Sequence, residues 1–173
     1  MSFRDEMNAS LKTPQQVARE KEDAEVAYAK MCVQNDYESI KRELKAKVQN
    51  GQYFDCGNGK VIEAEIFSGF LSENCSRNCK KVEKRYGFLG RDITYIHMLS
   101  ASFDVRKTVD VYFKELDKFV KEDGITYSVI GKYEDIVYKR VYTFSIPGGI
   151  NIEKLTPIWA KDIQVRLKVK MKL

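Results

Sequence analysis

Hydrophobic and polar residues alternate along several stretches of this chain, and residues 163–173 show the alternation without interruption. Apolar side chains occupy every odd position from Ile163 to Leu173, and Gln164, Arg166 and three lysines occupy the even positions. A period of two is the pattern of a β-strand with two different faces. The pattern therefore predicts a strand over residues 163–173, with one face in the core and a row of positive charge on the other.

Residues 92–146 show a strand, a helix and two further strands in close succession. The stretch 93–103 again alternates, and Asp104 after it is a suitable helix N-cap. Apolar residues then recur every three or four positions, which predicts an amphipathic helix over residues 105–123 that ends before Gly124. β-branched and aromatic residues predict strands over 125–130 and 136–146, separated by a turn at 131–135.

A single long helix is predicted over residues 13–50. Thr13-Pro14-Gln15-Gln16 is the signature of a capping box with proline at the first helical position, and Asn50-Gly51 is a stop signal. At the standard rise this helix is about 55 Å long, more than a domain of this size needs for a cover. Either it bends near Asn35-Asp36 and packs on its own domain, or its front half projects and is stabilised by another chain. Residues 1–12 show no periodicity and are expected to form a flexible arm.

The rest of the chain contains short sequence patterns that predict turns and a hairpin. Asn58-Gly59 between two β-type stretches predicts a hairpin with a type I′ turn, its strands lying within 53–57 and 60–67. Pro147-Gly148-Gly149 predicts a turn, and residues 151–160 are expected to be irregular or to form one helical turn.

Together these elements predict an α+β fold. The expected sheet is antiparallel or mixed, has five or six strands, and is covered by the central helix and by part of the long N-terminal helix. Residues 52–173 are expected to form one domain. The composition, 43% hydrophobic and 32% charged, is that of a globular chain. The chain has no apolar run of about 20 residues and begins with acidic rather than apolar positions, so we expect a cytoplasmic protein.

The net charge of +5 is concentrated in two segments, residues 76–91 and 161–173. The first lies in a helix predicted over 73–86, with Ser72 as its N-cap and the basic residues on its outer arc. A surface for polyanions is the functional interpretation, provided that the two segments share a face; solubility and protection of a sheet edge are the alternative. The candidate residues are Arg77, Lys80, Lys81, Lys84, Arg85, Arg166, Lys168, Lys170 and Lys172.

Motifs for chemistry are sparse. No glycine-rich phosphate loop is complete, and four cysteines in a chain of this length do not indicate a disulfide framework. Cys75 and Cys79 could place two ligands on one metal, but buried thiols are the favoured interpretation. Glu63 and Glu65 share a predicted strand face, where two carboxylates could hold magnesium, although a solvated face is the default. His97 is the only histidine, and neither a cofactor nor a metal is predicted.

The sequence favours a non-enzymatic binding protein that acts through its surface on a macromolecular partner. The expected partner is a protein, or a second copy of the chain, engaged through the N-terminal helix. Nucleic-acid binding through residues 76–91 and 161–173 is the alternative. A small metal-dependent hydrolase using Glu63, Glu65 and His97 is the third hypothesis.

Overall fold

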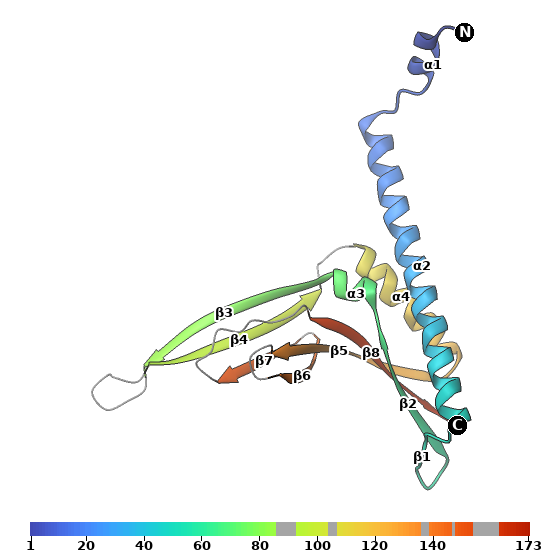
Figure 1. Ribbon diagram of the computed structural model, residues 1–173. Helices are drawn as coiled ribbons and strands as arrows, with labels where there is room; N and C mark the ends of the chain where they lie inside the picture. The colour runs from blue at the N-terminus through green and yellow to red at the C-terminus, as the bar shows by residue number, and fades with distance from the viewer. Residues whose placement is uncertain (86–92, 104–106, 136–138, 147, 154–162) are drawn as a thin grey trace.

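The computed structural model describes residues 1–85, 93–103, 107–135, 139–146, 148–153 and 163–173, and its elements are drawn in Figure 1. The protein has an α+β fold, as the sequence predicted. Its described helices are α1 (Phe3–Ala9), α2 (Pro14–Gln49), α3 (Gly69–Glu73) and α4 (Lys107–Glu122). Among the described residues, no helix combines the length and the apolar character needed to cross a membrane.

A five-stranded antiparallel sheet forms the centre of the molecule, with strand order β1-β2-β8-β5-β6. Its strands are β1 (Phe54–Asp55), β2 (Lys60–Phe67), β5 (Ile125–Asp135), β6 (Arg140–Ser145) and β8 (Gln164–Lys172). β8 is the last strand in the chain but lies between β2 and β5. The fully buried odd-numbered residues of β8 confirm the predicted alternation, since Val165, Leu167 and Val169 have no exposed surface.

A second sheet of three strands lies to one side of the first (Figure 1). It consists of β3 (Cys75–Arg85), β4 (Ile93–Phe103) and β7 (Gly148–Glu153), in the order β3-β4-β7. β3 and β4 pair antiparallel along their whole length, from Cys75 opposite Phe103 to Arg85 opposite Ile93.

Helices α2 and α4 pack against each other, α2 also against β2, and α4 against β5. The apolar stripe of α4 is buried as predicted, with Tyr112 and Leu116 fully inaccessible. Tyr37 of α2 stacks on Phe119 of α4 with ring centroids 4.9 Å apart. The helices thus bury one face of the five-stranded sheet and leave the other face to its polar side chains.

The predicted helix over residues 73–86 is wrong, because residues 75–85 form strand β3. Cys75, Cys79 and Val82 fit a helical spacing, but β4 alternates over eleven residues and needs a partner strand, and pairing between strands overrides weak local preference. Ser72 is not an N-cap; it lies in α3, where its hydroxyl donates to the Ser68 carbonyl at 2.7 Å.

Several turns also differ from the sequence prediction. Residues 131–135 belong to β5 rather than to a turn, and Gly148 and Gly149 belong to β7, which continues into the stretch expected to be irregular. The hairpin of β1 and β2 forms as predicted, but its positive φ angles fall on Gly57 and Gly59, not on Asn58, so the turn is not type I′. The first twelve residues contain the short helix α1. Asp104, Pro147 and residues 154–160 lie outside the described residues.

Gly131 leads to a testable prediction about the sheet. It is buried directly opposite Phe144, and a Cβ atom at Gly131 would overlap the Phe144 ring. Gly131→Ala should therefore lower the free energy of unfolding by about 1–3 kcal/mol, the usual cost of overpacking. Denaturant unfolding should show a smaller loss when the same substitution is made in a Phe144→Leu background, which removes the far end of the ring. Equal losses in both backgrounds would contradict the contact.

Candidate functional site

Helix α2 has a buried half and an exposed half. Its core contacts begin at Ala29 and continue through Val33, Tyr37, Ile40 and Leu44, which are all buried. Before Ala29 only Val26 is partly covered, and residues 14–25 are exposed on every side. Of the two arrangements left open by the sequence, the structure therefore has the projecting one: the front of α2 and α1 beyond it extend away from the sheets (Figure 1). Residues 1–28 are called the N-terminal projection below.

Local interactions hold the exposed half of α2 in helical form. The Thr13 hydroxyl accepts from the Gln16 backbone N–H at 3.2 Å, and the Gln16 side chain accepts from the Thr13 N–H at 2.8 Å, which completes the predicted capping box. Lys12 forms an ion pair with Glu20 at 2.6 Å. Because the buried half supplies a formed helix to extend, the exposed turns avoid the cost of nucleation. The projection is thus a continuation of a packed helix.

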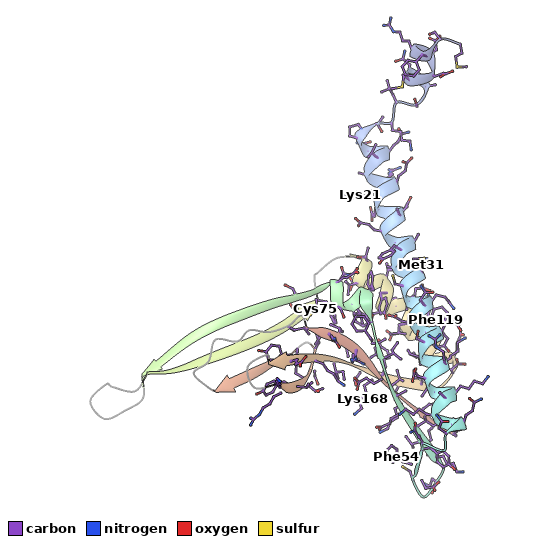
Figure 2. All side chains as sticks on the ribbon, in the orientation of Figure 1. Lys21, Met31, Phe54, Cys75, Phe119 and Lys168 are labelled. Carbon is purple, nitrogen blue, oxygen red and sulfur yellow. The ribbon has the colours of Figure 1, made fainter. Side chains whose placement is uncertain are left out.

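The projection carries most of the large apolar side chains that the described residues expose near the long helix. Figure 2 shows the side chains around Lys21 and beyond it without a neighbouring element beside them, and only the base of the projection reaches α3, where Tyr28 contacts Phe70. Surface apolar residues are common when scattered, but a group on one extended segment indicates a contact surface. These residues, with their exposed fractions, are Met1 (96%), Phe3 (76%), Met7 (52%), Leu11 (74%), Val17 (52%) and Tyr28 (47%); Met31 (54%) lies three positions beyond Tyr28.

A buried hydrogen-bond junction fixes α2 where it leaves the domain. The Asp36 carboxylate of α2 accepts from the hydroxyl of Tyr112 on α4 at 2.5 Å and from that of Ser68, the N-cap of α3, at 2.7 Å. The Tyr112 ring also stacks on Phe70 of α3 at 5.0 Å, and Phe70 contacts Tyr28. Three helices therefore meet at one carboxylate, and the direction of the projection is set there.

Burial raises the pKa of Asp36, while its two hydrogen bonds oppose that rise. Burial raises the pKa of Tyr112 above that of a free tyrosine, and the nearby Asp36 raises it further. Tyr112 therefore remains the proton donor and Asp36 the acceptor. With Ser68 and Tyr112 wholly inaccessible to solvent, this arrangement is suited to holding the helices together rather than to meeting a substrate.

The second candidate surface is the face of the five-stranded sheet that the helices leave open. Arg166, Lys168, Lys170 and Lys172 lie on this face of β8, as the sequence predicted for that strand, and Lys132 of β5 joins them. Figure 2 shows Lys168 on the side of the sheet away from Phe119. The hydroxyl residues Thr126 and Ser128 lie opposite Lys170 and Lys168.

Glu63 and Glu65 of β2 lie on the same open face and are ion-paired with its cations. Lys170 contacts Glu63 at 3.0 Å, and its hydrogen bond lowers the Glu63 pKa. Glu65 contacts Lys132 at 2.5 Å and Arg166 at 3.5 Å. Lys168 and Lys172 form no ion pair with another described residue. The two carboxylates thus neutralise part of the basic row, and no group of three or more metal-ligating side chains occurs among the described residues.

The other basic segment does not form the predicted helix with basic residues along its outer side. Arg77, Lys80, Lys81, Lys84 and Arg85 lie in β3, in a different sheet from β8, and successive residues of a strand alternate between its two faces. Their side chains lie outside the described residues, as do those of Cys79 and His97. Cys75 is a partly buried cysteine at the start of β3, and His97 lies in β4 opposite Lys81.

Sequence reasoning missed the Asp36 junction and a stripe of exposed residues on α2 formed by Val17, Ala24 and Met31. Nothing in the local sequence joins Asp36, Ser68 and Tyr112, since their separations along the chain exceed thirty residues. The stripe, by contrast, has a readable signal, because Val17, Ala24 and Met31 are spaced by seven residues along the predicted helix.

The junction gives a prediction that separates its hydrogen bonds from its charge. Asp36→Ala should lower the free energy of unfolding by roughly 2 kcal/mol or more, because two buried hydroxyls lose their acceptor. Asp36→Asn keeps an acceptor oxygen and should cost much less.

Asp36 also leads to a prediction about how the stability of the protein depends on pH. Because the pKa of Asp36 is raised on folding, the folded state binds the proton first as the pH falls. The stability of the wild type, measured by denaturant unfolding, should therefore rise relative to that of Asp36→Asn from neutral pH down through the folded-state pKa. If the stabilities of the two proteins changed in parallel with pH, a raised pKa of Asp36 would be contradicted.

Comparison with protein-family models, curated proteins and solved structures finds no match to this chain. The functional inferences below therefore depend on the residues and contacts of the chain itself.

Proposed function

We propose that this protein is a non-enzymatic binding protein that engages a protein partner through its N-terminal projection. The observation that carries the proposal is the group of exposed apolar side chains on a segment that adds nothing to the described core of its own domain. Burying one large apolar side chain contributes about 1.5–3 kcal/mol, so a partner that covered several of them would bind with useful affinity.

The anchoring of α2 supports this role. A projecting helix can present a surface to a partner only if its base is rigid, and the Asp36 junction together with the Tyr37–Phe119 stack supplies that base. Recognition of an apolar helix face by a second protein is a recurring mode of binding. The partner would meet a preformed helix and would not have to order it.

Nucleic-acid binding is a second candidate function, supported by the open face of the five-stranded sheet. Five cations lie there, on β8 and β5, and the two carboxylates of β2 pair with only some of them. Phosphates could be bound by Lys168 and Lys172 without breaking an ion pair among the described residues. Binding of this kind depends mainly on charge and weakens steeply with salt.

The protein-binding proposal predicts contact-specific crosslinking. A photoreactive amino acid at Val17, incorporated in the cells that make the protein, should give a specific crosslinked protein, identified by mass spectrometry. The same probe at Gln15, which lies on the other side of the helix, is the matched control.

A truncated chain that lacks residues 1–25 should remain folded, with a melting temperature within a few degrees of the full chain, and should lose the partner. Equal crosslinking from both positions, or retention of the partner by the folded truncated chain, would contradict the proposal.

The nucleic-acid candidate predicts a change in salt dependence. If an oligonucleotide binds the open face, Lys168→Ala with Lys172→Ala should weaken binding and reduce the slope of log affinity against log salt by about 2. Lys114→Ala with Lys121→Ala removes the same charge from the exposed surface of α4 and should leave the slope unchanged. Fluorescence anisotropy over a salt series measures both; equal slopes for the two double variants would exclude this face.

A further inference from the structure

We infer that the partner of the N-terminal projection is a second copy of this chain, paired antiparallel about a two-fold axis at Ala24. The inference rests on the proposed role of the projection in protein binding and specifies its partner. In this arrangement Val17 of each copy contacts Met31 of the other, and the two Ala24 residues meet at the axis.

The outer face of α2 carries the stripe that this pairing needs. Ala24 precedes the buried residue Val33 by nine positions, which at 100° per residue places it half a turn away from the packing face. Val17 and Met31 lie seven residues before and after Ala24 and share its face, with about 20° of drift each. All three are exposed, so the stripe is on the surface that the domain leaves uncovered.

The stripe is complementary to itself. A two-fold interface must present the same residues from both copies, each contact occurring twice. Equal spacing on both sides of Ala24 meets this condition, because one antiparallel register satisfies Val17 and Met31 together. The small side chain of alanine at the axis allows the two helices to approach closely. In the same register Lys21 faces the Tyr28 ring of the second copy, where a cation–π contact is favourable.

Charge complementarity extends the contact beyond the stripe. The antiparallel register carries α1 of one copy toward the C-terminal half of α2 in the other, on the same outer face. The exposed surface of α2 there carries Glu38, Lys41, Arg42, Lys45, Ala46 and Gln49. Three cations against one carboxylate make this surface positive, whereas the first turn of α1 carries two carboxylates, Asp5 and Glu6, against one cation, Arg4.

The exposed apolar residues of the arm have a place in the same arrangement. Phe3, Met7 and Leu11 would cover the aliphatic stems of Lys41 and Lys45 on this surface. A stable interface buries roughly 1,200–2,000 Å² in total, and the narrow stripe of three residues per copy is short for that size without the arms. Both parts of the projection therefore contribute to one interface.

Cysteine crosslinking tests the register directly. The variants carry Cys32→Ser and Cys56→Ser, because Cys56 is an exposed thiol and Cys32, next to Met31, is only partly buried. Ala24→Cys should form a disulfide-linked dimer under mild oxidation, while Gln15→Cys, on the opposite face, should not. Val17→Cys alone and Met31→Cys alone should remain largely unlinked, but an equimolar mixture of the two should give the linked heterodimer on a non-reducing gel.

Solution mass provides a second readout for the full chain. Light scattering on a concentration series should show a mass that rises from that of the 20.1 kDa monomer toward twice that value. Met31→Glu should abolish the rise, and Gln15→Glu, with the same change of charge, should retain it. Removal of residues 1–12 should weaken the dimer at least tenfold.

Two results would overturn the inference: a constant monomer mass with no Ala24→Cys linkage above the Gln15→Cys control, or self-linkage of Val17→Cys, which indicates parallel pairing. A monomer whose Val17 probe still crosslinks to a different protein would refute the dimer alone and leave the proposed function standing.

Discussion

The Asp36 carboxylate is the constraint on which the arrangement of helices depends. It is the shared acceptor for hydroxyls from α3 and α4, and it lies in α2 within two turns of the first fully buried residue of that helix. Apolar packing alone would allow α2 to slide or rotate on the sheet, because hydrophobic contacts are non-directional. Two directed hydrogen bonds at one point remove that freedom. Because α2 leaves the domain at a fixed angle, the far end of its long exposed half also has a fixed position.

The two candidate surfaces lie on different parts of the molecule and differ in chemistry. The projection is mixed, with apolar positions among charges of both signs, whereas the described residues of the open sheet face carry an excess of cations. Glu63 and Glu65 moderate that excess by pairing with Lys170, Lys132 and Arg166. Such pairs at the surface contribute little to stability, so their main effect is on local charge. A partner for one surface would leave the other accessible.

The sequence predicted the elements that carry a strong local signal. Capping residues defined α2 at both ends, and the uninterrupted alternation of residues 163–173 predicted both the strand and the side that it buries. β3 was mistaken for a helix because its few apolar residues fit a helical spacing, and its true partner, β4, is separated from it by seven residues. The continuation of β5 through Gly131 was missed for a related reason. Glycine is read as a turn signal, but here it makes room for the ring of Phe144 across the strand pair.

The candidate surfaces were predictable to a smaller extent. The positive face of β8 follows from its period of two, and the length of α2 already raised the question of a projection. The junction could not be found, since hydrogen bonds between Asp36, Ser68 and Tyr112 exist only after the fold brings three separate segments together. Charge density suggested a polyanion surface made by residues 76–91 and 161–173 if the two segments share a face, yet β3 and β8, the described strands within them, belong to different sheets.

The central place of β8 has a consequence for how the protein is made. β2 and β5 contact each other only through β8, so before residues 163–172 leave the ribosome the five-stranded sheet consists of two separate hairpins. Ile62, Ile66 and the inner face of α4 then lack the strand that covers them. Until residues 163–172 have emerged, the nascent chain leaves these apolar surfaces uncovered, and the pairing of β2 with β8 is a long-range contact of the kind that forms late in folding.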